Sequence, residues 1–382
     1  MTYDVIVIGA GSMGSATSYQ LAKRGRRVLC LEQFNIGHDL GSAHGVNRII
    51  RLAYAEHPAY VPLLRRAYTL WREIERTAKE RLLFITGGID AGPEDGEIFR
   101  GSLASCLEHK LKHEILTSRE LTRRFPGFRL PKAMKAVYQG DGGFVLSERA
   151  VVAYITAAQA LGAEIHAREA VRNWEVKRGR VIVGTDKGRY SASKLVITAG
   201  AWASKLVPSL RKRKLAVPER QVLIWTQPKS PALFRMGAFP VFNMEAVEDG
   251  ATNRYYGMPV YGVPGFKLGK YHHRRQTVDP NNMDRECHPE DEAILRAAIG
   301  RYFPDANGPT MAMKTCLFTN SPDEHFILDA HPEFPQVSIA AGFSGHGFKF
   351  ASVVGEIMAD FAMMGGSNWL ENLDLFRIGR KR

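Results

Sequence analysis

The stretch DVIVIGAGSMGSATSYQLAKRGRRVLCLEQ (residues 4–33) decides the fold of this chain. An apolar run precedes the first glycine, apolar residues with helical spacing follow, and a second apolar run begins after Gly25. This order predicts a strand, a helix and a second strand. Gly9, Gly11 and Gly14 form the pattern G-x-G-x-x-G at the turn between the first strand and the helix. Glycine at these places permits a tight bend and lets the diphosphate of a dinucleotide approach the backbone closely.

Glu32 ends the second predicted strand, where a carboxylate can accept hydrogen bonds from the ribose of a dinucleotide. The same carboxylate would repel a 2′-phosphate, so the sequence disfavours NADP. Ser12 and Met13 lie at the N-terminus of the predicted helix, whose partial positive charge favours the diphosphate. These features predict a bound dinucleotide, but they do not separate FAD from NAD.

The composition bounds the class of protein. The chain has 382 residues, 45% of them hydrophobic and 24% charged, so it can bury a large core and divide into two domains. Its formal net charge is +13, but the basic residues are scattered, and we expect no nucleic-acid partner. The four cysteines include no CxxC pair, which predicts neither a disulfide framework nor a metal site. Because no apolar run is long enough to cross a bilayer and no basic leader is present, we expect a cytoplasmic protein without a membrane partner.

Two later stretches repeat the pattern of a strand that ends in small residues. KLVITAGAWASKL (residues 194–206) places Gly200 and Trp202 after a short apolar strand. VSIAAGFSGHGFKF (residues 337–350) places a glycine-rich loop between a strand and a helix, and such a loop can offer backbone N–H groups to an anion or a flavin ring. The glycines of this loop are Gly342, Gly345 and Gly347. Because the three turns are far apart in sequence, we expect one nucleotide-binding domain assembled from separate segments, and a second domain from the pieces between them.

Four longer stretches carry a resemblance to a known family. They are GSAHGVNRIIRLAYAEHPAYVPL (residues 41–63), YYGMPVYGVPGFKLGKYHH (255–273), CLFTNSPDEHFILDAHPE (316–333) and AAGFSGHGFKF (340–350). Through them the chain resembles the monomeric sarcosine oxidase and N-methyl-tryptophan oxidase family, within the glycine oxidase and D-amino-acid oxidase-like fold group. The resemblance implies FAD linked through its 8α-methyl group to a cysteine. It also implies that a secondary amino acid is oxidised by oxygen, giving an imine and hydrogen peroxide.

The resemblance assigns roles to five residues around the cofactor. Cys316 corresponds to the flavin-linking residue, through an 8α-S-cysteinyl bond, and Arg48 lies against the flavin ring with His44 close by. Arg51 and Lys349 correspond to the ligands of the substrate carboxylate, which implies an α-amino acid substrate. Arginine suits this task because its planar fork meets a carboxylate with two parallel hydrogen bonds. From their spacing, Arg48 and Arg51 would share a face if their segment were helical.

Further residues correspond to the catalytic positions of the family. Lys267 matches the lysine that activates oxygen, an electrostatic task for a fixed charge in a dry site. Tyr256 resembles a tyrosine that lines the substrate cavity. Either His272 or His273 corresponds to the active-site histidine, and we favour His272 because it directly follows Tyr271.

Two positions depart from the family pattern. Phe318 stands where the family usually has tyrosine, and Asn47 stands where it usually has threonine. Loss of the phenol removes a polar group from the cavity wall and favours a less polar substrate side chain near it. Gly345 adjoins both the substrate and the cofactor in this comparison, as does Lys349.

We therefore expect an α/β fold with a Rossmann-like FAD-binding domain and an α+β substrate domain with a mostly antiparallel sheet. The FAD-binding segments are residues 1–85, 146–217 and 311–382, and the substrate segments are residues 86–145 and 218–310. The expected substrate is sarcosine or another N-methyl, N-alkyl or cyclic α-amino acid, with hydride transfer from Cα to flavin N5 and with oxygen as the second substrate. The expected oligomeric state is a monomer.

Other functions stay open from the sequence. An FAD-dependent dehydrogenase with another electron acceptor keeps every cofactor residue, although Lys267 argues against it. A primary-amino-acid oxidase is a further alternative. A nucleic-acid-associated flavoprotein is indicated only by the charge and leaves Arg51 and Lys349 without a purpose. An NAD-dependent dehydrogenase gives the late segments no role.

Overall fold

The computed structural model describes residues 2–370 and 374–380, and its first sheet is largely parallel. The parallel strands are β1 (Thr2–Ile8), β2 (Val28–Leu31), β9 (Glu164–His166), β12 (Arg189–Ile197) and β19 (Val337–Ala341). They lie in the order β9-β2-β1-β12-β19. Antiparallel strands extend this sheet, and they are β10 (Val171–Lys177), β11 (Arg180–Thr185) and β18 (Ile327–Ala330). The pieces that make the sheet come from the beginning, the middle and the end of the chain, as the three separated turns predicted.

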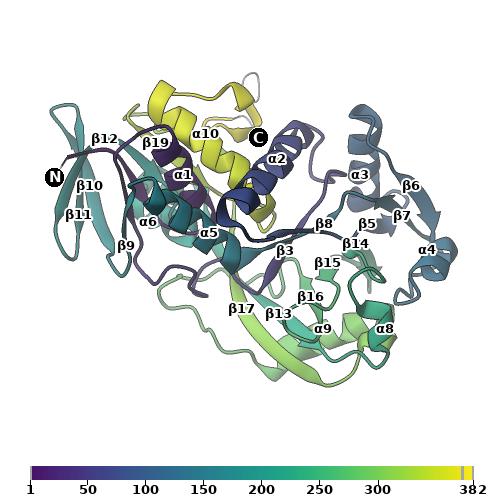
Figure 1. Cartoon of the computed structure of the whole chain (residues 1–382). Helices are drawn as coiled ribbons and strands as arrows, with labels where there is room; N and C mark the ends of the chain where they lie inside the picture. The colour runs from purple at the N-terminus through teal and green to yellow at the C-terminus, as the bar shows by residue number, and fades with distance from the viewer. Residues whose placement is uncertain (1, 371–373, 381–382) are drawn as a thin grey trace.

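Three helices cover one face of this sheet, and they are α1 (Ser12–Lys23), α5 (Ser147–Ala160) and α10 (Ala351–Met364). A fourth helix, α2 (Tyr60–Ala78), packs against α5 and α10 (Figure 1). Alternate strand residues face this core, such as Val5 and Val7 of β1. Ile6 and Ile8 face a second core, which the short helices α6 (Ala203–Leu206) and α7 (Pro208–Lys212) help to build. Burial on both faces explains why these strands are continuously apolar. The strand, helix and strand predicted from residues 4–33 are confirmed as β1, α1 and β2.

The second sheet is mostly antiparallel and lies in the lower right part of Figure 1. Its strands, in spatial order, are β17 (Thr310–Asn320), β13 (Val217–Thr226), β16 (Phe266–Lys270), β15 (Ala251–Met258), β14 (Val241–Glu248), β5 (Gly88–Pro93), β7 (Met134–Gln139) and β6 (Glu114–Thr117). The pair β5 and β14 is parallel, and every other neighbouring pair is antiparallel. The helices that accompany the sheet are α3 (Glu97–Glu108), α4 (Ser118–Arg124), α8 (Pro231–Phe234) and α9 (Pro289–Tyr302).

The two faces of this sheet have different surroundings. Val222, Ile224 and Leu268 point to one side, into an aromatic-rich core that includes α9. Because side chains alternate along a strand, their neighbours Leu223 and Trp225 point to the other side, where they pack with Cys316. That second face carries Lys267 and Cys316, and Cys316 shares a cavity there with glycines of the parallel-sheet turns.

A third, small sheet is formed by β3 (Asn47–Ile50), β8 (Gly143–Leu146) and β4 (Leu83–Ile85), with β8 in the centre. The segment of Arg48 and Arg51 is therefore a strand that ends at Ile50, and the helical spacing considered for it is wrong. Pairing with β8 explains the difference, because it satisfies the backbone groups of β3.

The expected domain division places a boundary between residues 310 and 311, and strand pairing runs across this boundary. β17 begins there, and it pairs with β13 along almost its whole length, which places residues 311–320 in the antiparallel sheet. The remaining boundaries of the two-domain division stay a prediction. Among the described residues, no helix is both long and apolar enough to span a bilayer.

Candidate active site

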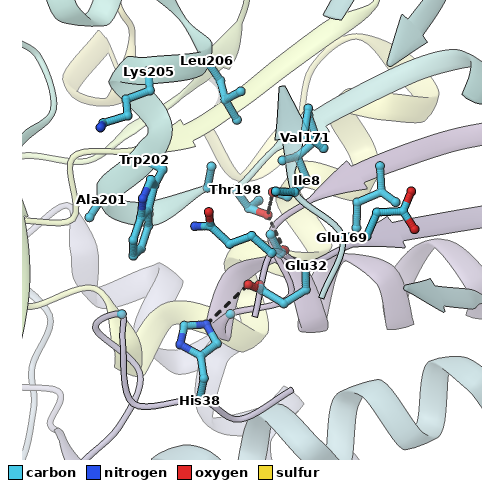
Figure 2. Close-up of a pocket in the computed structure, with 18 of the residues that line it drawn as sticks. Ile8, Glu32, His38, Glu169, Val171, Thr198, Ala201, Trp202, Lys205 and Leu206 are labelled. Atoms are coloured by element: carbon cyan, nitrogen blue, oxygen red, sulfur yellow. Dashed lines mark hydrogen bonds and ion pairs between the residues drawn. The ribbon is translucent and has the colours of Figure 1, made fainter. Parts of the chain in front are cut away.

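A cavity opens at the carboxyl ends of β1, β2 and β12, the edge at which open α/β sheets bind ligands. It has a volume of about 290 Å³, and we call it the nucleotide cavity. Figure 2 shows Ile8, Glu32 and Thr198 from the strand ends, with Trp202 from the turn that follows β12. Trp202 is fixed by a hydrogen bond from its Nε1 to Oδ1 of Asn281 at 2.6 Å.

Glu32 is held by the chain on both of its oxygens. Its Oε2 accepts a hydrogen bond from the backbone N–H of Ala10 at 2.8 Å, and its Oε1 accepts one from the N–H of Phe34 at 3.0 Å. Nε2 of His38 lies 3.5 Å from Oε1, and a dashed line marks this pair in Figure 2. A carboxylate has about four lone-pair sites. Glu32 therefore keeps room for the ribose hydroxyls that the sequence predicted it to bind.

The turn between β1 and α1 depends on its glycines. Gly9 has a φ of +93°, and a Cβ there would lie 2.7 Å from the carbonyl oxygen of Thr198. A Cβ at Gly14 would lie 1.7 Å from the carbonyl oxygen of Gly9, whereas one at Gly11 would meet no atom within 4 Å. The turn is thus tightly packed at Gly9 and Gly14 and open at Gly11, where a diphosphate can approach the N-terminus of α1.

A second cavity, the central cavity, continues from the first and has a volume of about 120 Å³. It shares Gly11, Thr198 and Gly200 with the nucleotide cavity. Its lining contains many of the residues predicted to hold the cofactor, which are Gly11, Ser12, Met13, Arg48, Gly200, Cys316, Gly342, Gly345 and Gly347. The structure therefore brings residues from all parts of the chain to one place.

The thiol of Cys316 lies in the central cavity beside two basic side chains. Nη2 of Arg48 lies 3.5 Å from Sγ. Burial alone would raise the pKa of Cys316, but His44 and Arg48 outweigh it and lower this pKa to about 6. His44 is 1% exposed, and neither of its ring nitrogens has a hydrogen-bond partner among residues 2–370 and 374–380. Cys316 is therefore mostly thiolate at neutral pH, and the polar atoms of His44 fit a polar ligand in this space.

A third, inner cavity adjoins the central one and has a volume of about 40 Å³. It shares Arg48, Phe318 and Gly345 with the central cavity. The residues predicted to bind substrate all line it, and they are Arg51, Tyr256, Phe318, Gly345 and Lys349. Asn243, Met258 and Tyr271 also line it, although the sequence did not single them out for this role.

Arg51 is buried and paired with two carboxylates. Its Nε donates to Oδ1 of Asp90 at 3.0 Å, and its Nη2 donates to Oε2 of Glu56 at 3.0 Å. Burial raises the pKa of Asp90 to about 6 against the opposing effect of Arg51. Burial would also raise the pKa of Glu56, but the nearby charges, Arg51 first among them, together outweigh it and lower this pKa to about 2. Sequence reasoning missed both acids. A lone aspartate in the apolar strand GIDAGP was the available signal, because buried carboxylates need a partner.

Lys349 supplies the second cation of the inner cavity. Its Nζ donates to the backbone carbonyl of His346 at 2.7 Å and lies 5.3 Å from the ring centre of Tyr54. Burial, with the nearby charge of Arg51, lowers the pKa of Lys349 to about 7. Lys349 therefore changes its charge near neutral pH, while Arg51 keeps its charge.

Lys267 projects from β16 toward the loop before β3. Its Nζ donates to the carbonyl of Gly45 at 2.7 Å, to the carbonyl of Asn47 at 2.8 Å and to Oδ1 of Asn47 at 3.0 Å. Three acceptors match the three N–H bonds of an ammonium group. Lys267 is buried behind this loop and lines neither the central nor the inner cavity. Asn47, the departure noted in the sequence, thus anchors Lys267.

His272 does not reach the inner cavity. It lines a larger outer cavity of about 1130 Å³, and its two ring nitrogens each lie 2.9 Å from a carboxylate oxygen, of Glu219 and of Glu324. These two hydrogen bonds raise the pKa of His272 to about 9. His273 is buried on the side of α9. Tyr271, and neither histidine, therefore reaches the space around Arg51 and Lys349.

The connected cavities fit FAD. The nucleotide cavity offers Glu32 for a ribose and the N-terminus of α1 for a diphosphate. The central cavity offers an open glycine-rich passage that ends at Cys316, with Arg48 and the unpartnered His44 beside it. No cluster of His, Cys, Asp or Glu suited to a metal ion occurs within the described residues.

Comparisons with known proteins agree with this geometry. The family described as FAD dependent oxidoreductase (DAO) matches residues 4–361. The chain is 40% identical over 381 residues to the monomeric sarcosine oxidase of Bacillus sp. (strain NS-129), covering 99% of this chain and 97% of that protein. It is 35% identical over 364 residues to the N-methyl-L-tryptophan oxidase of Yersinia pestis (strain Pestoides F), covering 95% of each.

Among solved structures, the chain is similar to NikD, an unusual amino acid oxidase essential for nikkomycin biosynthesis, in its open form. The TM-score is 0.82 at 25% identity, and the similarity covers 97% of each chain. Both the sequence relatives and this structure extend over nearly all of the present chain. The chain therefore belongs to the family of FAD-dependent oxidoreductases that contains the monomeric sarcosine oxidases.

Proposed function

We propose that this protein oxidises a secondary α-amino acid with FAD and oxygen, and that it releases hydrogen peroxide. One observation carries the proposal: Arg51 and Lys349 converge on a small cavity that shares Phe318 and Gly345 with the cavity of Cys316. Two cations there favour a substrate carboxylate. Bound FAD would supply the two-electron acceptor for a hydride from a carbon attached to the amine nitrogen, and would pass the electrons to oxygen.

Arg51 and Lys349 would hold the substrate by its carboxylate. Asp90 and Glu56 occupy the Nε and Nη2 of Arg51, and no partner among the described residues occupies its Nη1. Lys349 donates to one carbonyl and keeps two N–H bonds. One donor from each side chain can therefore meet the two carboxylate oxygens, and this placement of the substrate supplies most of the catalytic help.

Cys316 and Lys267 would serve the cofactor. The thiolate of Cys316 is the proposed covalent attachment point, since His44 and Arg48 favour the anion. Lys267 would place a fixed positive charge near the position where oxygen is reduced, held there by Gly45 and Asn47. We also propose that the protein acts as a monomer in the cytoplasm, in keeping with the sequence expectation.

A peroxide-release screen tests this function. We expect peroxide from sarcosine, other N-methyl amino acids or cyclic amino acids such as proline, and much less from simple amines without a carboxylate. Formaldehyde and keto-acid assays on the same reactions tell which carbon next to nitrogen is oxidised. Reduction of a dye without peroxide release would instead indicate a dehydrogenase, and peroxide from primary amino acids alone would indicate a primary-amino-acid oxidase.

Acetate binding should depend on pH through Lys349. We expect acetate, followed by the change it makes in the flavin absorption spectrum, to bind most tightly below about pH 7. Because the pKa of Lys349 is about 7 and only its protonated form attracts a carboxylate, the affinity should fall by up to about tenfold per pH unit above this value. Lys349→Met should bind acetate weakly and without this step. A step that persists in Lys349→Met would contradict the assignment.

A further inference from the structure

Three aromatic rings pack side by side in the lining of the inner cavity. The ring centres of Tyr256 and Tyr271 are 5.2 Å apart, and those of Tyr271 and Phe318 are 5.4 Å apart. Of the inner and outer cavities, Tyr256 and Phe318 line only the inner one, whereas Tyr271 lines both. Within the described part of the chain, Tyr271 is the one residue that the linings of the two cavities share.

The register of β16 directs Tyr271 to this position. Lys267, Gly269 and Tyr271 alternate along the strand and its end, so they project to the same face of the sheet. Gly269 is needed beside them, because a Cβ there would lie 2.5 Å from the Tyr256 ring. The backbone N–H of Tyr271 donates to the carbonyl of Arg254 at 2.8 Å, which fixes the chain as it leaves the strand.

The hydroxyl of Tyr271 has no hydrogen-bond partner among the described residues, and the side chain is therefore held by ring packing. Burial, followed by the charge of Glu56, raises the pKa of Tyr271, so the phenol stays neutral. Packing against Tyr256 and Phe318 holds this ring where the linings of the two cavities meet, so it forms part of the wall between them.

The two cavities differ greatly in size. The inner one measures about 40 Å³ and the outer one about 1130 Å³. By this measure a single water needs about 10–15 Å³, so the inner cavity has room for only a few groups the size of a water molecule. A bulky substrate side chain has no space there, but it would find space in the outer cavity if the wall were open.

We propose that Tyr271 sets the size of the substrate: its ring closes the inner cavity, so that the enzyme accepts small secondary amino acids and rejects those with bulky side chains. The inference rests on the proposed function, because it assumes that the inner cavity binds the amino acid. Tyr271 would thus determine specificity in the site for which the sequence favoured His272. The substrate class is then sarcosine or an amino acid of similar size.

The test compares sarcosine with N-methyl-L-tryptophan in wild type and in Tyr271→Ala. We expect wild type to prefer sarcosine in kcat/KM by about 100-fold or more, since a closed pocket strongly excludes an extra ring. Tyr271→Ala should reduce this preference at least about tenfold, chiefly through a lower KM for N-methyl-L-tryptophan. Tyr271→Phe keeps the ring and should keep the preference within about threefold.

Thr252→Ala is the matched control, because Thr252 is exposed and lines the outer cavity only. Its preference should equal that of wild type. If Tyr271→Ala fails to fold with bound flavin, Tyr271→Leu should shift the preference in the same direction. The inference is overturned if the preference is unchanged in Tyr271→Ala, or shifts equally in Tyr271→Phe, or is absent in wild type.

Failure of the proposed function has a different signature. If wild type oxidises neither compound, the proposed function is wrong for this pair of substrates. The role of Tyr271 can still be tested by binding, because each compound can be titrated against the flavin absorption spectrum. Tighter binding of N-methyl-L-tryptophan to Tyr271→Ala than to wild type supports it, and equal binding overturns it.

Discussion

Replacing Cys316 with serine is expected to abolish the retention of flavin by the denatured protein. Wild type precipitated with acid, or run on a denaturing gel, should keep its yellow colour and flavin fluorescence, and Cys316→Ser should lose both completely. The reason is chemical. His44 and Arg48 outweigh the effect of burial on Cys316 and lower the pKa of its thiol to about 6, which favours the reactive thiolate. Serine keeps the size of the side chain, but its hydroxyl does not ionise near neutral pH.

The other cysteines provide the control for this experiment. Burial raises the pKa of Cys30 and of Cys106 to about 12, and it raises the pKa of Cys287 as well. None of the three lines the nucleotide, central or inner cavity. Cys287→Ser, at a half-buried site, should therefore keep covalent flavin. Release of all flavin by the wild type, or flavin retained by Cys316→Ser, would show that the attachment is wrong.

Local sequence spacing was enough to predict the first part of this fold. Gly9, Gly11 and Gly14 lie between two short apolar runs, and each feature depends on residues within one turn or one strand. The structure confirms β1, α1 and β2 at those places. The late glycine loop was predicted in the same way, with β19 before it and α10 after it. Local rules suffice where the contacts that select a conformation are themselves local.

The rest of the site depends on contacts between distant segments. Asp90 lies beside Asn243 because β5 pairs with β14, and no spacing within either strand reveals this. The local spacing around Arg48 is compatible with a helix, but pairing with β8, about 100 residues away in the sequence, makes this segment a strand. His272 was favoured over His273 by order in the sequence, but neither lines the inner cavity, and alternation along β16 turns Tyr271 to it. Cross-strand register is decided by the whole sheet, and one sequence does not give it.

Replacing Lys267 with methionine is expected to slow the reaction of the reduced enzyme with oxygen about 100-fold or more. Negative charge develops on oxygen as it accepts electrons, and a fixed cation in a dry site stabilises that charge by about 3 kcal/mol. Lys267 is 2% exposed and is held by the carbonyls of Gly45 and Asn47. Methionine keeps a similar stem but removes the charge. Stopped-flow measurement of the oxidative step, separate from reduction by the amino acid, gives the result.

The dependence of this step on pH tests the same charge. Burial, with Arg48 nearby, lowers the pKa of Lys267 well below its usual value, although three oxygen acceptors favour the ammonium form. Since only the protonated form carries the charge, the oxidative rate of wild type should fall as pH rises through this lowered pKa. The rate of Lys267→Met should not change with pH in this way.

Lys314 provides the comparison for Lys267, since it is exposed and pairs with Asp39 on the surface. Both lysines lie on strands of the same sheet, but only Lys267 is buried next to the loop before β3. Lys314→Met should therefore react with oxygen within about threefold of wild type. A loss of less than about tenfold in Lys267→Met, roughly 1.4 kcal/mol, would mean that oxygen is reduced without help from this charge. An equal loss in Lys314→Met would point to the overall positive field of the protein instead.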